Sequence, residues 1–597
     1  MDRQEGQIGR GDSHVRNSGV WNVISWVVII GLTAVAAILI GRRMTDESIQ
    51  THPRAWTSAI QVAEVEGLNT SPALSPDGRI LAASLADPHN PDLVHLYAKP
   101  IENGDWVRVT VSPSKDWFPT WTPDGMQLGF VRQESSGSVA IYQIALLGGK
   151  ERRILESFQD IAGFEWHADT SHLIIAERPS EKDPYTLYEV PFETRLRTQI
   201  SFPPQTCFGD VFPRVSPLGN QVAFVRQQAT GEGNVMLMDL ESRSVKAVTH
   251  SFRQVSGLSW RADGKALIFS AWRSGEESLW ELPLDSGESA PQPLVPGPAG
   301  FPSTGGKSHS LVYCESSLVD QMEIYRLEDF YRFHPFKDWR LEKGIDHLAF
   351  GPNSEVFATS EATSEGVELV LRKTADGSVK AKWQLQGEWV GRPFWSPDSS
   401  ALVVAIREQA QKKIYQLQVD EPSAEILWQS ELPFYLSGWR GPANSLLISS
   451  PREGEWQLWD LFPETQSWSL RTPHGGFLGE EISGTDNLVY SKRHSSGLWQ
   501  CLENGDEHRL LTTFGNGALG PWAVHELGLF FVASTRHGTT LNHLDFIGKR
   551  VRSLGGLEAD HFEEMSLSPD GRLIVLKPVS TAKTQLKLLQ SEVVQRP

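Results

Sequence analysis

The chain has 597 residues, of which 40% are hydrophobic, including 26 Phe and 21 Trp. This composition can bury several large cores and excludes a wholly disordered protein. Lysines and arginines number 55 against 73 acidic residues, giving a net charge of −18, which argues against the basic surface that nucleic-acid binding requires. The cysteines Cys207, Cys314 and Cys501 are too few and too widely spaced for a disulfide framework or a zinc site.

The first 58 residues precede the globular part of the chain. Residues 1–20 show no apolar periodicity, and we expect a short disordered tail. Residues 21–40 carry no charge, and as a helix they would span about 30 Å, the thickness of a bilayer core. We predict a transmembrane helix over 21–41 and a linker over 42–58, with a cleaved signal peptide as the alternative. Arginines lie on both sides of the span, so charge does not fix its orientation.

Beyond the linker, one short motif recurs: an apolar residue, a turn of the type S-P-D-G, and an apolar strand. Clear copies occupy 74–84, 121–131, 395–405 and 567–577. Whole multiples of about 46 residues separate the members of two residue classes, the turn prolines (Pro76, Pro123, Pro217, Pro352, Pro397) and a set of tryptophans (Trp121, Trp166, Trp260, Trp395, Trp439). The shared period indicates a repeat architecture.

Each repeat continues with an almost wholly apolar strand, such as QVAFV, and then with an alternating strand. The alternating strand recurs twelve times, from VHLYAKP to TQLKLLQS, and a short fourth strand follows most copies. Four strands in a period of about 45 residues are typical of a β-propeller blade. We therefore predict an all-β chain of twelve blades.

The two ends of the repeat region complement each other. Residues 59–67 look like a fourth strand that precedes the first blade, whereas the last repeat stops after its third strand. We expect the early segment to complete the terminal blade and remove an exposed sheet edge. Because propellers usually have about 4–8 blades, we predict two rings of six, over 59–331 and 332–597. A split of seven and five blades stays open.

These blades resemble the TolB-like, or PD40, branch of WD40-type β-propellers over residues 59–591. More narrowly, SPALSPDGRILAAS after an apolar span, SGLSWRADGKALIFS and a closing LSPDGRLIVL resemble the sensor half of bacterial membrane-anchored winged-helix transcription regulators. That resemblance implies a single-pass inner-membrane protein with periplasmic propellers, acting in envelope sensing or transcriptional signalling. Residues 1–20 are too short to encode a winged helix. We therefore expect no direct nucleic-acid binding by this chain, and assign any DNA contact to a partner protein.

Two glycine-rich runs look like nucleotide-binding loops. Gly305-Gly306-Lys307-Ser308, within residues 300–310, lacks the spacing of a P-loop, and its register with the preceding repeat makes it the first turn of blade six. GNGALG, residues 515–520, is followed by strand-like residues instead of the helix that a dinucleotide site needs. We predict a blade turn and an inter-blade loop, and no cofactor.

The chain contains neither G-x-S-x-G nor H-E-x-x-H. We also find no close cluster of histidines and acidic residues with metal-ligand spacing, and expect His167, His172, His537 and His543 at the surface. The repeated tryptophans are expected to pack between blades. Trp456, Trp459 and Trp499 could line a recognition surface, although packing is the favoured interpretation.

Together these patterns favour a non-enzymatic module that binds a protein, peptide or glycan. We assign it no catalytic, cofactor-binding or metal-binding residues. One alternative is a structural role in envelope assembly. The other is a propeller-type hydrolase or lyase, which carboxylates and histidines converging in one channel would support.

Overall fold

The computed structural model describes Trp56 and residues 58–590 with short internal gaps, of which 66–70, 285–289 and 512–520 are the largest. The described residues form strands and no helix. Among them, therefore, no helical segment could cross a membrane. The predicted tail, transmembrane helix and most of the linker lie outside the described residues.

The strands form twelve blades in two rings of six, as the repeat predicts. Ring 1 comprises blades β2 (Pro72–Leu74), β3 (Ile80–Asp87), β4 (Asn90–Pro100), β5 (Val107–Arg108); β6 (Lys115–Trp121), β7 (Gln127–Gln133), β8 (Val139–Ala145), β9 (Arg152–Glu156); β10 (Asp160–Trp166), β11 (His172–Arg178), β12 (Thr186–Pro191), β13 (Thr198–Gln199); β14 (Cys207–Val215), β15 (Gln221–Gln228), β16 (Glu232–Asp239), β17 (Val245–Ala247); β18 (Phe252–Trp260), β19 (Ala266–Arg273), β20 (Glu276–Pro283), β21 (Gln292–Val295); and β22 (Ala299–Thr304), β23 (Ser310–Val319), β49 (Ser580–Gln590), β1 (Ile60–Val65).

Ring 2 has the same four-stranded plan. Its blades are β26 (Ile345–Phe350), β27 (Val356–Thr363), β28 (Gly366–Lys373), β29 (Val379–Leu385); β30 (Glu388–Trp389) with β31 (Phe394–Trp395), β32 (Ala401–Glu408), β33 (Gln411–Gln418), β34 (Ser423–Ser430); β35 (Tyr435–Arg440), β36 (Ser445–Ser450), β37 (Gln457–Phe462), β38 (Ser467–Leu470); β39 (Gly479–Glu481), β40 (Leu488–Lys492), β41 (Ser495–Cys501), β42 (Glu507–Leu511); β43 (Trp522–His525), β44 (Gly528–Thr535), β45 (Gly538–Asp545), β46 (Arg550–Leu557); and β47 (Phe562–Leu567), β48 (Leu573–Pro578), β24 (Glu323–Glu328), β25 (Arg332–Pro335).

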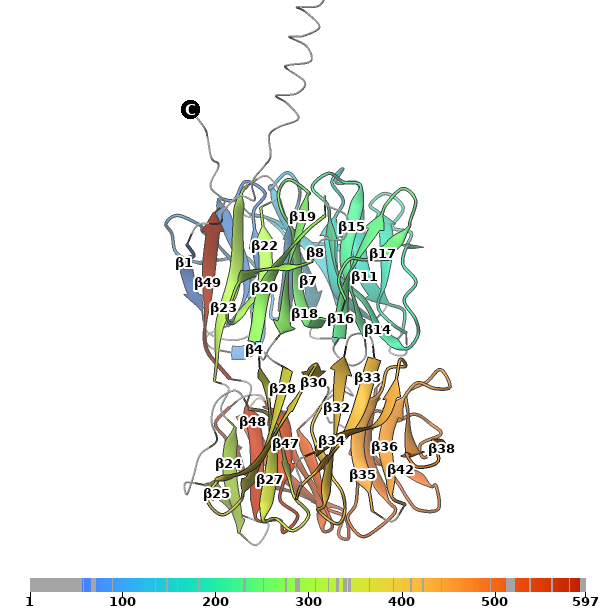
Figure 1. Cartoon of the computed structure of the whole chain (residues 1–597). Coiled ribbons are helices and arrows are strands. Elements are labelled where there is room, and N and C mark those ends of the chain that lie inside the picture. Colours follow the sequence, from blue (N-terminus) through green and yellow to red (C-terminus); the bar gives the residue numbers. More distant parts are fainter. Residues whose placement is uncertain are drawn as a thin grey trace, which may run out of the picture. The chain divides into compact units, whose positions relative to one another are not determined.

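The sixth blades of the two rings exchange their outer strands. After β23 the chain enters ring 2, where β24 pairs with β48; after β48 it returns to ring 1, where β49 pairs with β23. Figure 1 shows β49, in red, beside the green β23 in one ring, and β24 beside β48 in the other. The predicted boundary at residues 331/332 is therefore wrong, because it placed residues 323–328 in the first propeller and 580–590 in the second.

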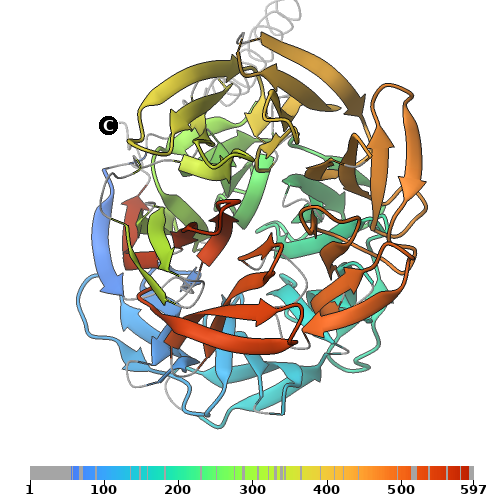
Figure 2. The ribbon, with the colours of Figure 1, turned by 90° about the horizontal axis from the view of Figure 1, so that it is seen from below.

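The early strand closes a blade as expected. β1 pairs antiparallel with β49, from Ile60 opposite Leu588 to Val65 opposite Thr584. The blade that it completes belongs to ring 1. Side-chain bonds also join first and last blades: Leu74 N–H donates to Ser303 Oγ (3.0 Å) in ring 1, and Asp570 N–H to Ser354 Oγ (3.2 Å) in ring 2. Figure 2 shows the blades arranged around a centre.

The S-P-D-G turns are held by their own side chains. In the first blade Ser75 Oγ donates to Asp77 Oδ1 (2.6 Å), which accepts from Arg79 N–H (3.1 Å), and Gly78 has a φ of 76°. A positive φ favours glycine, and Asp and Ser side chains replace backbone partners in such turns. The run at 300–310 is the corresponding turn of ring 1's sixth blade: it begins in β22, Ser308 N–H donates to Gly305 O (3.0 Å), and β23 follows.

The repeated tryptophans join neighbouring blades, as predicted. Four of the five indole N–H groups donate to a carbonyl on the innermost strand of the preceding blade: Trp121 to Ala73 (3.0 Å), Trp166 to Thr120 (3.2 Å), Trp260 to Arg214 (2.9 Å) and Trp395 to Ala349 (3.1 Å). Trp439 is the exception, since it donates to Asn444 Oδ1 of its own blade (3.2 Å). One repeat period of about 46 residues thus separates each of these indole N–H donors from its acceptor in the preceding blade.

The two rings also contact each other through side chains. Glu232, at the start of β16, forms ion pairs of 2.8 Å with both Arg407 and Lys412 of ring 2. Thr206 O accepts from Trp456 Nε1 (3.2 Å) and from Arg493 (3.1 Å). Trp456 and Trp459 are both buried, which supports the packing interpretation for these two residues.

Candidate functional site

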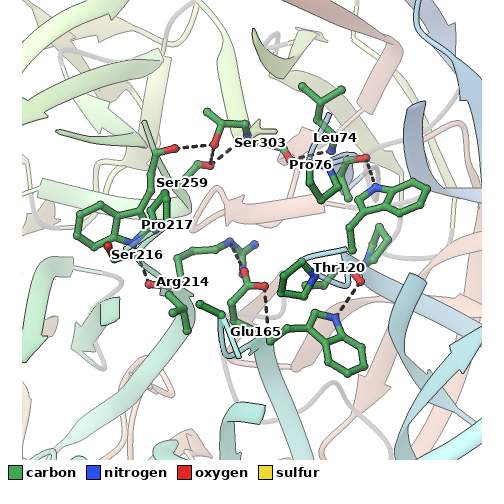
Figure 3. A pocket seen from close by; sticks show the side chains of 18 of the residues that line it. Leu74, Pro76, Thr120, Glu165, Arg214, Ser216, Pro217, Ser259 and Ser303 are labelled. Carbon is green, nitrogen blue, oxygen red and sulfur yellow. Dashed lines mark hydrogen bonds and ion pairs between the residues drawn. The ribbon is translucent and has the colours of Figure 1, made fainter. Parts of the chain in front are cut away.

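A cavity of about 240 Å³ opens at the centre of ring 1, where the innermost strands of all six blades end. Its lining comes from six corresponding segments, 72–76, 119–123, 165–168, 214–217, 259–260 and 303–304. We call it the ring 1 mouth (Figure 3). The contacts with ring 2 involve Thr206 and Glu232, which lie at or just before the starts of β14 and β16. The mouth is therefore at the opposite strand ends from these contacts.

Prolines and hydroxyl side chains form most of the wall of the mouth. Pro72, Pro76, Pro119, Pro123 and Pro217 all line it, and proline offers a ligand no backbone N–H. The hydroxyls of Ser259 and Thr304 bond to each other (2.9 Å), and Thr304 N–H donates to Ser259 Oγ (3.1 Å). The wall is therefore built of side chains that the ring itself holds in place.

One charged pair, Glu165 and Arg214, projects into the mouth. The two side chains point toward each other in Figure 3, with Arg214 Nε 3.8 Å from Glu165 Oε2. Two backbone carbonyls hold the Arg214 guanidinium in place: Nε donates to Leu258 O (3.1 Å) and a terminal nitrogen donates to Pro213 O (2.9 Å). Burial raises the pKa of Glu165 to about 7, although the charge of Arg214 acts in the opposite direction. Near neutral pH this carboxyl can therefore be ionised or protonated.

A bulge interrupts three of the innermost strands of ring 1. Phe118, Phe212 and Phe301 each precede a proline and adopt φ values of 51–52°, which non-glycine residues rarely do. The pairing register shifts at each of these sites, as β-bulges require. The rings of Phe118 and Phe212, from blades two and four, contact each other edge to face at 6.0 Å. These three Phe-Pro dipeptides are a visible sequence signal that the repeat analysis did not use.

Buried ion pairs brace two of these bulges. Arg132 binds both oxygens of Asp116 (2.6 and 2.8 Å), and Arg226 does the same to Asp210 (2.7 and 2.8 Å). Both carboxylates are fully buried. Such two-point contacts fix the strand geometry as well as neutralising charge, so the bulge that leads to Arg214 has a rigid base.

Sequence reasoning did not single out Glu165 or Arg214. Both occupy one repeat position, immediately before the repeated Trp or its replacement, where the other blades carry Ala73, Thr120, Ser259 and Ser303. The sequence signal was therefore two charged residues at a repeat position that is otherwise occupied by small residues. These residues form a site only because the ring brings the corresponding positions of six blades together.

Ring 2 has a second cavity, of about 160 Å³, at the starts of its innermost strands. Its lining includes His347, Arg392, Glu480 and Glu564. His347 Nδ1 lies 2.5 Å from Glu564 Oε2, and Arg392 forms an ion pair with Glu480. Burial works to raise the pKa of Glu564, but His347 and then Arg392 outweigh it and hold that pKa below its ordinary value. We call these four residues the ring 2 cluster.

Of the four histidines that were expected at the surface, three lie within the described residues. His167 and His172 are at a turn, but they come together with Asp169, so that one ligand atom from each lies within 4.8 Å of the others. The expectation that no histidine–acid cluster exists is therefore wrong here. His543 is also not at the surface: it is buried in β45, 4.6 Å from the Phe530 ring, and burial lowers its pKa. His537 lies outside the described residues.

The glycine-rich run at 515–520 and the three cysteines are the remaining features that the sequence analysis considered. GNGALG at 515–520 lies outside the described residues, and β43 begins shortly after it. The three cysteines are buried and form no disulfide with one another.

Part of the chain, at its N-terminal end, matches a known family model. The family model PD40, TolB beta propeller domain, matches residues 48–201, so the predicted TolB-like propeller is confirmed. The chain is 13% identical to the tricorn protease over 88% of this chain and 58% of that one (TM-score 0.30). It is 14% identical to TolB from Acinetobacter baumannii over 59% and 76% (TM-score 0.25), and 10% identical to the Niastella koreensis GH74 enzyme over 88% and 91% (TM-score 0.32). No activity or partner follows from similarity at this level.

Proposed function

We propose that this TolB-like β-propeller chain is a non-enzymatic binding module that takes a protein, peptide or glycan ligand at the ring 1 mouth. The observation that carries the proposal is the convergence of six blades on one cavity with a single Glu165–Arg214 pair at its centre. Rigid scaffolds that present loops around a concave site are suited to recognition. A charged pair within apolar and hydroxyl walls supplies orientation and specificity.

The turns around the mouth support docking of a ligand larger than the cavity. Met126 and Leu218 stand at the tips of two S-P-D-G-type turns with 64% and 69% of their surface exposed. Exposed apolar side chains beside a polar-centred cavity favour an extended contact with a macromolecule. Glu165 and Arg214 would then meet polar groups of the inserted segment.

The cellular setting belongs to the same proposal. Residues 21–41 would anchor the chain in the bacterial inner membrane, with the rings on the periplasmic side. The ligand would be an envelope component, and any effect on transcription would pass through a separate DNA-binding protein. The apolar run at 21–40 supports the anchor, and the resemblance to regulator sensor halves supports the setting.

Site-specific photocrosslinking tests the proposed face. A benzoylphenylalanine replaces Ala168, which lines the mouth, or Pro397, the corresponding turn residue of a ring 2 blade. Irradiated cells should yield a discrete adduct from position 168, and that adduct should disappear in an Arg214→Glu background. The same adducts from both positions, or an adduct indifferent to Arg214→Glu, would contradict binding at the mouth.

The ring 2 cluster favours one second candidate, a propeller-type hydrolase or lyase. His347 and Glu564 are in hydrogen-bond contact and share a cavity with Glu480 and Arg392, and paired acid–base groups are what such reactions require. The test is turnover of chromogenic glycosides, uronate polysaccharides and peptides by the full chain. Turnover that Glu564→Gln abolishes and Glu453→Gln, an exposed substitution, preserves would establish this second function. No turnover would eliminate it.

A further inference from the structure

The turn between β10 and β11, in the third blade of ring 1, gathers three metal-binding side chains. His167 Nδ1 lies 2.9 Å from Asp169 Oδ1, and His172 Nδ1 lies 3.6 Å from Asp169 Oδ2. The two imidazole rings are 5.8 Å apart and nearly perpendicular. One tight turn positions all three: Thr170 N–H donates to His167 O (2.9 Å), His167 N–H to His172 O (3.0 Å), and Thr170 has a φ of 60°.

The other blades show what this turn normally contains. At the position of His167, three of them have a hydroxyl that donates to the turn Asp: Ser75 to Asp77, Thr122 to Asp124 and Ser396 to Asp398. At the position of His172 the same three turns carry Ile80, Gln127 and Ala401. The turn therefore needs no histidine to fold. The third blade has a histidine at both positions that flank the carboxylate.

The spacing suits a tetrahedral d-block ion. Two imidazoles and one carboxylate are common Zn²⁺ ligands, and Zn–N and Zn–O bonds of about 2.0–2.2 Å put neighbouring ligand atoms about 3.3 Å apart. The observed 2.9 and 3.6 Å, which run to the two different oxygens of Asp169, lie on either side of that value, and one ligand atom from each residue lies within 4.8 Å of the others. The side chains of His167, His172 and Asp169 are 19%, 30% and 50% exposed, so an ion can reach them.

We propose that His167, Asp169 and His172 form a Zn²⁺ site on the rim of the ring 1 mouth. Three protein ligands leave a fourth position to solvent, as in open zinc sites. The ion would replace the present contact between Ser171 Oγ and His172 Nδ1 (2.6 Å). Ala168, between two of the ligands in sequence, lines the mouth, so the site would lie beside the cavity. Metal binding itself does not depend on the proposed function.

Titration of the metal-free full chain with Co²⁺, followed by competition with Zn²⁺, tests the site. Co²⁺ in a four-coordinate site with nitrogen ligands absorbs visible light, and Zn²⁺ should displace it and abolish the band. We expect one ion per chain and a loss of affinity of at least about tenfold in Asp169→Asn and more in the His167→Ala/His172→Ala double variant. The control is His334→Ala, which removes an exposed histidine 3.8 Å from a Glu328 oxygen and should bind like wild type.

Thermal unfolding gives a second readout that separates folding from binding. All variants should unfold close to the wild-type temperature without metal, because the corresponding turn at Ser75 folds without histidine and Asn at 169 keeps an oxygen that can accept from Ser171 N–H (2.8 Å in the wild type). Saturating Zn²⁺ should raise the midpoint of wild type and of His334→Ala but not of the double variant, because only an intact site stabilises the folded state. Absence of the Co²⁺ band, or equal binding by the double variant, overturns the proposal.

Discussion

At the scale of residues, the ring 1 mouth contains one carboxylic acid, Glu165, whose pKa is unusually high. Glu165 lies among prolines and hydroxyls that bond to one another, and Trp166 N–H (3.1 Å) and Arg214 (3.8 Å) do not fully replace the water that its ionised carboxylate loses. Burial therefore raises its pKa from 4.5 to about 7. The mouth presents Arg214 with a partner whose charge depends on pH within the physiological range.

The raised pKa of Glu165 predicts a pH dependence of stability. Between about pH 4.5 and 7 the folded chain holds a proton that the unfolded chain has released, so the free energy of unfolding falls as pH rises and levels off above about 7. Glu165→Gln should remove this contribution, of at most about 3 kcal/mol. Urea unfolding at several pH values measures it. A variant and wild type with the same slope across this window would contradict the assignment.

At the scale of elements, the repeated tryptophan attaches a blade to the preceding one through its indole N–H. Trp121 donates to Ala73 O and is itself buried, whereas Trp439 bonds within its own blade. The tryptophan period in the sequence therefore has a structural cause. It records where each blade attaches to the previous one.

This attachment predicts unequal effects of two identical substitutions. Trp121→Phe leaves the Ala73 carbonyl without its indole donor at a blade interface and should lower the free energy of unfolding by about 1–3 kcal/mol. Trp439→Phe loses only a bond to an Asn side chain and should cost less. Denaturant unfolding of both variants measures the difference. A larger loss in Trp439→Phe would contradict the interface role of the repeated indole.

The blades could be predicted from sequence because their signals are local. Turn residues, apolar second strands and alternating third strands lie within one repeat, so the twelve blades and the closing strand β1 follow from 59–67 and the repeat itself. The exchange could not be predicted. EIYRLE and TQLKLL have the same alternating pattern, and each follows an equivalent apolar strand. The local sequence does not indicate whether each segment pairs with the apolar strand just before it or with the one before the other segment. The cluster of His167, Asp169 and His172 was missed because a turn, and not a helix, supplies its spacing.

At the scale of the whole molecule, the exchange ties each ring to the other. The chain leaves ring 1 before its sixth blade is complete, closes ring 2 with β24 and β48, and returns to finish ring 1 with β49. Each ring's sixth blade therefore contains strands from two distant parts of the chain. A sequential pair of rings would lack this mutual dependence.

Removal of residues 579–590 separates the two topologies. Without β49, ring 1 loses the partner of both β23 and β1, so hydrogen exchange should accelerate in those two strands. β24 and β48 should keep their protection, because they pair with each other. Hydrogen-exchange mass spectrometry of the truncated chain measures this pattern. Loss of protection confined to ring 2 would instead indicate sequential rings.

Binding at the ring 1 mouth is the central claim, and one comparison of affinities tests it most directly. A peptide or glycan selected from displayed libraries on the full chain is titrated against wild type, Arg214→Glu and Arg243→Glu; Arg243 is a surface arginine of the same blade, paired with Glu189. Because Arg214 lies at the cavity centre, its reversal should weaken binding by at least about tenfold, or about 1.4 kcal/mol. Arg243→Glu should leave the affinity within about twofold, since rim charges contribute little. Equal affinities in all three chains would contradict the account.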